Sequence, residues 1–410
     1  MNAFRKLLPL TLLCCTALSH GAATGDAIEQ YQEAIDELEA HYGAYDIGLA
    51  EPLRGLGEAL QANGEHQDAI DIFKRGLHVR RVNDGISSIS QEPLLRLLNS
   101  SYQAVGNVGA VATNYQRQLD LYRSHHGNSS PKLLPLQLEA ARWHRGQYIQ
   151  TRNKEAFAHL TEAIRLITNA SAIDSQQKDS LTIERLNSEI ENHYYLIDHF
   201  QRFAPRPPAD YVRFQSRNFR PRYRDESRFE YQIAYDNHLR RETARLTKRY
   251  QREQIDSAVS KALATYNRLS RLHQSNQEPL LQANSLVQQG DWLILFGNSP
   301  QQAHSLYRKS WQLLTDNNQL EERTSLFGEP HLLPVFDTPD PANFTTIAKV
   351  KMDIDLNGKA RNITVLETQP DEKSVARKAQ RQLRDARFRS RLDNGEPTTS
   401  EGYELSLLID

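Results

Sequence analysis

One pattern of small and apolar residues occurs twice between residues 53 and 115, and it constrains the fold more than any other feature of the sequence. Its first copy, with successive spacings of 3, 1, 3, 4, 5, 4 and 3, consists of Leu53, Leu56, Gly57, Leu60, Gly64, Ala69, Phe73 and Gly76. Spacings of three and four place side chains on one face of a helix, and Asn63-Gly64 is a helix-stop signal between the two halves. The pattern therefore predicts two helices joined by a short turn.

The second copy is displaced by 42 residues (Leu53 to Leu95) and consists of Leu95, Leu98, Asn99, Tyr102, Gly106, Val111 and Tyr115. This arrangement resembles the tetratricopeptide repeat, whose usual period is about 34 residues, and the longer period implies longer helices. The resemblance implies a solenoid whose groove holds peptides or protein segments. The positions it marks as structural are Leu56, Gly57, Gly64, Ala69, Phe73, Leu98, Tyr102, Gly106 and Tyr115.

Weaker copies follow downstream. A third begins near Leu136 and has its partner helix at Ala156 to Ile167, and a last copy lies in Asn284 to Leu314. In that last copy, Ala303, Tyr307 and Trp311 are four residues apart and form an aromatic stripe. Such a stripe is typical of a helix face packed in a core, and we interpret it as core rather than as a cofactor site.

The last stretch, residues 344–410, has a different pattern. Apolar and polar residues alternate over 348–356, Asn357-Gly358 is suited to a tight hairpin turn, and a second strand is predicted over 359–367. A charged helix follows, and two short strands are expected around 386–389 and 403–408. The order β-β-α-β-β predicts a small α+β domain with Phe388 and Leu405 in its core.

This stretch resembles the C-terminal domain of TonB-type energy transducers. The resemblance rests on Asp355-Leu-Asn-Gly-Lys359, Asn362-Ile-Thr-Val-Leu-Glu367, the helix that runs into Arg387-Phe-Arg389, and Gly395-x-Pro397. It implies a periplasmic, non-catalytic module that binds partners through an edge strand. We expect that strand at 402–409, with the partner-binding residues Tyr403, Leu405, Leu407 and Ile409.

Residues 1–23 have the features of a cleavable secretory signal peptide. Arg5-Lys6 precede a short apolar segment, and small residues offer cleavage sites from Ser19 onward. Both cysteines, Cys14 and Cys15, lie in this segment, so cleavage would leave a periplasmic chain without thiols. The alternative is a retained inner-membrane anchor, which Thr16-x-x-x-His20 loosely resembles.

We therefore predict a mainly α chain with a tetratricopeptide-like body at 24–328, a Pro-containing linker at 329–343 and a TonB-like domain at 344–410. An Arg/Tyr-rich insertion at about 204–228 interrupts the body. Its arginines are candidates for an anionic partner such as an envelope glycan or a lipid phosphate, although we favour the interpretation that they pair with nearby acidic side chains along helix faces. They are Arg217, Arg220, Arg222 and Arg224.

Composition narrows the functional classes. The 50 Lys and Arg residues balance 51 Asp and Glu residues, so no overall field favours nucleic acid. No catalytic, metal-binding or phosphate-binding motif is present, so no enzyme activity, metal, cofactor or small-molecule substrate is expected. The predicted function is a scaffold for protein partners of the cell envelope, including outer-membrane proteins. One alternative is an anchored transducer that supports outer-membrane transport, and the other is the glycan or lipid-phosphate binder.

Overall fold

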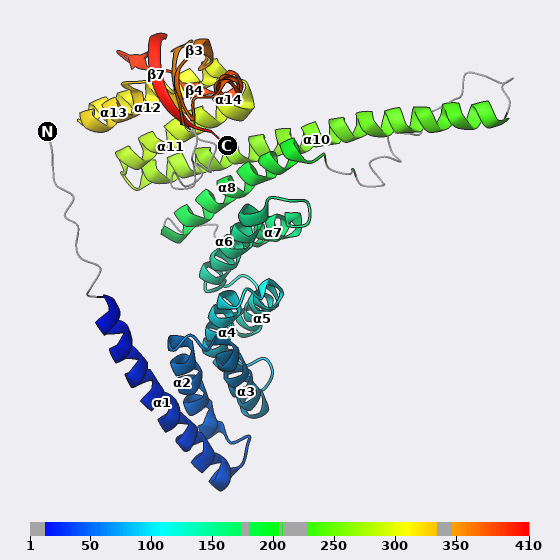
Figure 1. Ribbon diagram of the computed structural model, residues 1–410, viewed down its shortest axis with the longest axis vertical. Helices are drawn as coiled ribbons and strands as arrows, with labels where there is room; N and C mark the ends of the chain where they lie inside the picture. Colours follow the sequence, from blue (N-terminus) through cyan, green and yellow to red (C-terminus); the bar gives the residue numbers. More distant parts are fainter. Residues whose placement is uncertain (1–12, 174–179, 205–206, 208–227, 334–346, 410) are drawn as a thin grey trace. The chain divides into compact units, whose positions relative to one another are not determined.

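The computed structural model describes residues 13–173, 180–204, 207, 228–333 and 347–409 (Figure 1). The chain divides into two compact units. Unit 1 comprises Met1–Gly146 and Arg165–Ser175, and unit 2 comprises Gln147–Ile164 and Gln176–Asp410. Neither boundary coincides with the linker predicted at 329–343. Among the described residues, no helix is long and apolar enough to cross a membrane.

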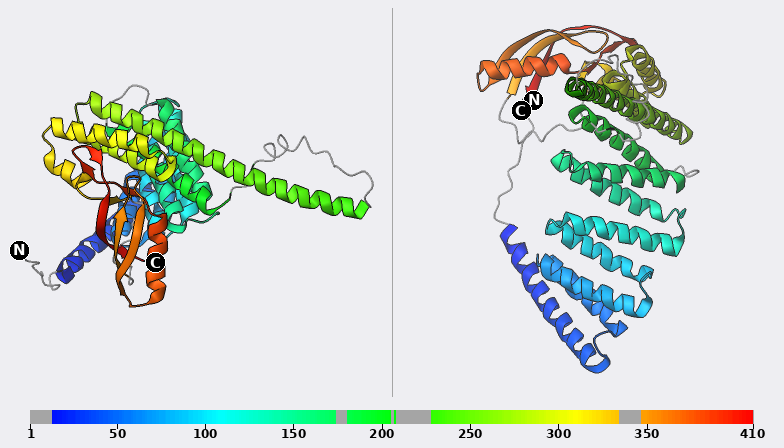
Figure 2. Two further views of the ribbon diagram at one scale, coloured as in Figure 1. Left: turned by 90° about the horizontal axis from the view of Figure 1, so that it is seen from above. Right: turned by 90° about the vertical axis from the view of Figure 1, so that its right-hand side faces the viewer.

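Unit 1 contains two successive helix pairs that are related by a strict period (Figure 2). The bounds of the second pair reproduce those of the first after 42 residues: helix α2 begins at residue 50 and α4 at 92, and α3 ends at residue 84 and α5 at 126. This periodicity confirms a tetratricopeptide-like helical repeat. The elements are α1 (Leu13–Tyr42), the short 3-10 helix η1 (Ile47–Leu49), α2 (Ala50–Ala62), α3 (His66–Asp84), the short 3-10 helix η2 (Ile89–Gln91), α4 (Glu92–Ala104), α5 (Val108–His126) and α6 (Leu133–Thr151), which continues into unit 2 after Gly146.

The turn between successive pairs is built three times in the same way. Gly43, Gly85 and Gly127 have φ values of 88°, 90° and 86°, a region that favours glycine because it has no Cβ. Three residues later, the side chains of Asp46 and Ser88 accept hydrogen bonds from the backbone of Gly48 and Ser90 and cap the next helical turn. These local signals set where each helix pair ends.

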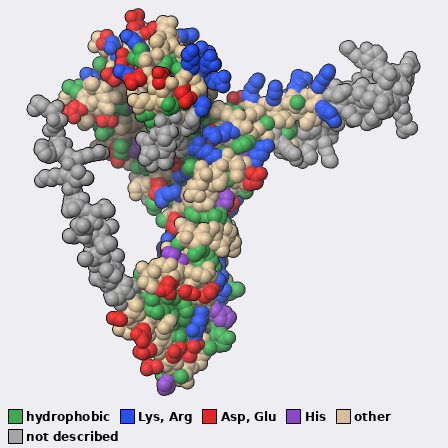
Figure 3. Space-filling model, in the orientation of Figure 1, with side chains coloured by type: hydrophobic (Ala, Val, Ile, Leu, Met, Phe, Trp, Pro, Cys, Tyr) green, Lys and Arg blue, Asp and Glu red, His purple; other side chains and the backbone are tan. Residues whose placement is uncertain are grey.

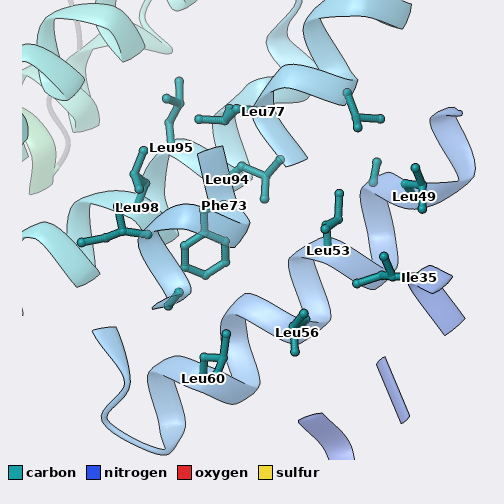
Figure 4. Close-up of a cluster of buried hydrophobic side chains, with 14 of the residues drawn as sticks. Ile35, Leu49, Leu53, Leu56, Leu60, Phe73, Leu77, Leu94, Leu95 and Leu98 are labelled. Atoms are coloured by element: carbon teal, nitrogen blue, oxygen red, sulfur yellow. The ribbon is translucent and has the colours of Figure 1, made fainter. Parts of the chain in front are cut away.

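The core of unit 1 is aliphatic, with Phe73 at its centre (Figure 4). Gly57 faces this ring so closely that a Cβ at position 57 would lie 2.2 Å from a Phe73 ring carbon. The small residue therefore sets the distance between α2 and α3. Other fully or nearly buried members are Leu49, Leu53, Leu56, Ala69, Leu95 and Leu98.

Unit 2 contains long helices followed by shorter pairs. Its core includes Tyr148, Tyr266 and Trp292, and the aromatic stripe of the last copy is buried at Ala303 and Tyr307 and half-buried at Trp311. The interpretation of the stripe as core is thereby confirmed. Its helices are the first part of α7 (Phe157–Ile173), which continues into unit 1 from Arg165, and then α8 (Ser180–Arg202), α10 (Arg228–Ser275), α11 (Pro279–Trp292), α12 (Pro300–Asp316) and α13 (Leu320–Phe327), with a π-helical turn at Leu293–Gly297.

The C-terminal part of unit 2 is a three-stranded antiparallel sheet in the order β3-β2-β7. Helix α14 covers one face, where Val375, Ala379 and Leu383 meet the buried side of β2. The other face is open, as is common for antiparallel sheets. The elements are β1 (His331–Leu332), β2 (Ile347–Ile354), β3 (Ala360–Gln369), α14 (Lys373–Asp385), β4 (Phe388–Arg389), β5 (Leu392–Asp393), β6 (Glu396–Pro397) and β7 (Ser400–Leu408).

Two details differ from the sequence prediction. The strand expected around 386–389 is only the two-residue β4, and it pairs with β1 outside the main sheet. Consequently the first part of the predicted linker, Glu329 to Leu333, is folded: Leu333 is buried and its amide donates to the Arg387 carbonyl at 2.9 Å. Residues 334–343 of that linker lie outside the described residues. The prolines of this segment predicted an extended spacer, but its apolar residue Leu333 is buried in the folded domain.

Candidate functional site

The main sheet has two edge strands, β3 and β7, which differ in how regularly they pair with the central strand β2. Strand β7 pairs with β2 without interruption from Ile347↔Leu408 to Met352↔Tyr403. The pairing of β3 with β2 is irregular at two places, and Asn362 in β3 has a φ of 50°. Bulges and twists blunt an edge, whereas a long regular edge strand offers its backbone to another chain. Strand β7 has one irregularity of its own, opposite Met352 and Ile354, where Gly402 has a φ of 66°. Its remaining residues, 403–408, pair regularly, so β7 is the edge better suited to pairing.

The side chains of β7 lie on two faces. Tyr403, Leu405 and Leu407 are half-buried against the sheet's core, and Ile409 is buried just after the strand. The four predicted partner-binding residues thus pack in the core of the domain, and their contact with a partner stays a prediction. The alternating residues Glu404, Ser406 and Leu408 are exposed. The period-two pattern identified the strand but could not show which face is covered.

A buried ion pair fixes strand β4 to the helices of unit 2. Arg389 donates through Nε and Nη2 to the two carboxylate oxygens of Asp291 in α11, at 3.0 and 2.8 Å. Its Nη1 donates to the Leu326 carbonyl in α13 at 2.9 Å. The side chains of Arg389 and Asp291 are only 7% and 14% exposed. Bidentate geometry of this kind fixes orientation as well as charge.

Aromatic residues surround this pair. The guanidinium carbon of Arg389 lies 6.0 Å from the ring centroids of both Tyr307 and Phe327, and the Tyr307 hydroxyl donates to Asp291 Oδ1 at 2.8 Å. Burial, reinforced by the Asp291 charge, raises the pKa of Tyr307 well above its ordinary value. Burial lowers the pKa of Arg389, but the carboxylate of Asp291 outweighs that effect and the net shift is upward. Arg389 therefore keeps its positive charge at neutral pH.

A second, exposed ion pair joins the same two parts of unit 2. Arg308 in α12 donates to Glu396 Oε2 in β6 at 3.0 and 2.7 Å, and both side chains are about half exposed or more, at 48% and 65%. Sequence reasoning found neither pair. Arg389 and Asp291 are 98 residues apart, and nothing local marks either residue.

Unit 1 carries its own candidate surface, a hollow of about 320 Å³ between α3, α4 and α5. Basic, polar and apolar side chains line it, among them Arg81, Arg117, Tyr102 and Leu98. The predicted repeat position Tyr102 thus contributes to a surface, whereas Phe73 and Tyr115 are buried. Gly64 and Gly106 occupy the turns, with φ values of 83° and 70°.

The arginines predicted to bind an anionic partner cannot be assigned a place in the fold. Arg217, Arg220, Arg222 and Arg224 lie outside the described residues. In the part of the chain that the structure describes, no group of three His, Cys, Asp or Glu side chains is arranged to hold a metal ion.

The helix pairs and their 42-residue period define the class of protein: a tetratricopeptide-like repeat protein with a small C-terminal sheet domain. No protein-family model matches the sequence, and comparison with curated proteins finds no match. Among solved structures, this chain is similar to two forms of a kinesin light chain with nearly identical TPR-like repeats from Podosopora anserina. Their identities are 17% and 19%, their TM-scores 0.33 and 0.31, and the alignments cover 58% and 57% of this chain and 93% and 96% of those chains. It is also similar to BtubC from P. vanneervenii, with 13% identity and a TM-score of 0.32 over 73% of this chain and 91% of that chain.

Proposed function

We propose that this protein is a non-catalytic interaction scaffold that binds an extended protein segment along strand β7. The observation that carries the proposal is the regular pairing of residues 403–408 of β7 with β2, which leaves six residues of regular strand at the edge of the sheet. Backbone hydrogen bonds along such an edge supply affinity, and alternate side chains supply selectivity. Glu404, Ser406 and Leu408 would contact the partner beside the new strand.

The buried ion pair supports this function because it immobilises the domain that presents the edge. Arg389 is held by Asp291 and by the Leu326 carbonyl, and β1 pairs with β4 next to it. A binding strand that is already ordered loses less conformational entropy when a partner associates. Helical repeats add extended surfaces for a second protein segment.

The finer proposal concerns compartment and partners. The signal-like residues 1–23 and the TonB-like residues of 344–410 favour a periplasmic location and partners in the cell envelope, including outer-membrane proteins. An energy-transducing role in transport would additionally need a retained N-terminal anchor.

Site-specific photocrosslinking in intact cells tests the proposal. A photoreactive residue at Ser406, exposed on β7, is compared with one at Thr364, exposed on the opposite edge strand β3. We expect a discrete crosslinked protein from position 406 and none from position 364. Equal crosslinking from both edges, or none from either, would contradict binding along β7.

A further inference from the structure

Two guanidinium groups meet at the hollow of unit 1. Arg81 Nε in α3 and Arg117 Nη2 in α5 both donate to one oxygen, Gln91 Oε1, at 3.2 and 2.9 Å. Within the described part of the chain, neither arginine forms an ion pair with a carboxylate. A guanidinium has five N–H donors, so most donors of each group remain available to a ligand.

Gln91 is built into the fold as the support of this pair. Its side chain is fully buried, and its amide nitrogen donates to the carbonyls of Gly85, Ile86 and Ser88 at 3.2, 2.9 and 3.3 Å. These bonds fix the orientation of the amide and direct Oε1 toward the guanidiniums. Because the amide is neutral, it orients the two positive charges without neutralising them. Burial lowers the pKa of Arg81, but arginine remains charged at neutral pH.

The preceding repeat provides an internal comparison. The residues 42 positions before Arg81, Gln91 and Arg117 are Glu39, Leu49 and Arg75. There, Arg75 is paired with the Glu39 carboxylate, and Leu49 is fully buried in place of the glutamine. The same helix geometry therefore contains a closed ion pair in one repeat and two unpaired cations in the next. The residue at this repeat position is acidic in the first case (Glu39) and basic in the second (Arg81).

The hollow beside these cations suits a side chain rather than a bare ion. It measures about 320 Å³, and Leu77, Leu98 and Tyr102 contribute apolar surface next to the arginines. Lys74 also lines it but is paired with Asp71 at 3.2 Å. In Figure 3, acidic side chains gather over α1 and α2 at the lower left, and basic side chains lie on the side of α3 and α5.

We propose that this hollow binds a carboxylate side chain of an extended acidic protein segment. Arg81 and Arg117 hold the carboxylate, and Leu77, Leu98 and Tyr102 receive an adjacent apolar side chain. The inference rests on the proposed function, since it specifies the chemistry of a segment that the repeats would bind. It concerns unit 1 alone, so it does not depend on pairing along β7.

Fluorescence anisotropy with the full chain tests the site. The probes are a short fluorescein-labelled peptide with two glutamates flanked by leucines and a matched peptide with glutamines in their place. We expect the glutamate peptide to bind at least about tenfold more tightly, the factor that charged hydrogen bonds provide. The preference should shrink as salt is added.

Arg81→Glu is the decisive variant because it recreates the charge pattern of Glu39 and Arg75. We expect it to abolish the preference for glutamate without lowering the melting temperature, since Arg117 gains an ionic partner. Arg75→Gln, in the preceding repeat, should keep the preference. An unchanged preference in Arg81→Glu, or equal binding of both peptides by the natural chain, would overturn the proposal. Arginine-dependent binding of inorganic phosphate without a peptide preference would also overturn it. Crosslinking at position 406 should be unaffected, so the two proposals can fail separately.

Discussion

Replacing Arg389 with leucine should release the C-terminal domain from the helices of unit 2. The Asp291 side chain is only 14% exposed. After the change, the Tyr307 hydroxyl is its remaining hydrogen-bond donor within the described part of the chain. Removal of one partner of a buried ion pair costs about 3–5 kcal/mol, because the remaining charge is left buried without compensation. The lost bond to the Leu326 carbonyl adds to this cost.

Hydrogen exchange measured by mass spectrometry resolves this effect within the full chain. In Arg389→Leu, amides of β1, β4 and α13 should exchange faster by a factor of about 100 or more, because about 1.4 kcal/mol corresponds to a tenfold change. Peptides from α2 to α5 in unit 1 serve as the internal reference and should keep their exchange rates.

Two further variants separate the buried charge from general surface effects. Arg308→Ala removes the exposed pair with Glu396 and should cost no more than about 1 kcal/mol. The double variant Arg389→Leu, Asp291→Leu should recover part of the loss, because no unpaired charge remains. Similar exchange rates for Arg308→Ala and Arg389→Leu would refute the assignment of Arg389 as the residue that fixes the domain.

Three other perturbations have expected outcomes. Phe388→Ala, at a fully buried position of the sheet domain, should lower the free energy of unfolding by about 3–5 kcal/mol and accelerate amide exchange in β2 and β7. An unchanged exchange rate would count against the role of Phe388 in the core. Gly57→Ala should lower the melting temperature of unit 1 by forcing a methyl group against Phe73, and Phe73→Leu should partly rescue it; additive losses in the double variant would contradict that contact. Burial lowers the pKa of His193 and His199 below 6.5, so the unfolded chain binds more protons and stability should fall as pH decreases below about 6.5. A urea series from pH 7.5 to 5 should show this loss, reduced in His193→Gln, and equal midpoints across the series would contradict it.

The repeat could be predicted from sequence because its determinants are local. Leu56, Gly64 and Phe73 recur in kind 42 residues later, and helix boundaries follow from glycine turns and capping residues. The strands β2 and β7 were predictable for the same reason, since alternation over several residues is a local signal. Resemblance to tetratricopeptide repeats therefore placed the helices well.

The candidate sites could not be predicted because they depend on contacts between distant residues. The covered face of β7 is decided by α14, whose Val375 and Leu383 lie in the same core as Leu405. Folding of Glu329 to Leu333 depends on β4, which lies more than 50 residues downstream (332 to 388). Only the anion site had a visible signal: comparison of the two repeats shows arginine at position 81 where the first has Glu39.

The stability of β4 explains why the ion pair would matter for the proposed binding along β7. The ladder between β1 and β4 contains only two residue pairs, His331↔Arg389 and Leu332↔Phe388, and so short a ladder is marginal by itself. Arg389 adds three hydrogen bonds to separate helices from within that ladder. The adjacent Phe388 is buried in the sheet's core, so the same two residues tie the sheet to the helices. Movement of the sheet would have to break the buried charge pair, and the edge strand β7 is therefore held in place before any partner arrives.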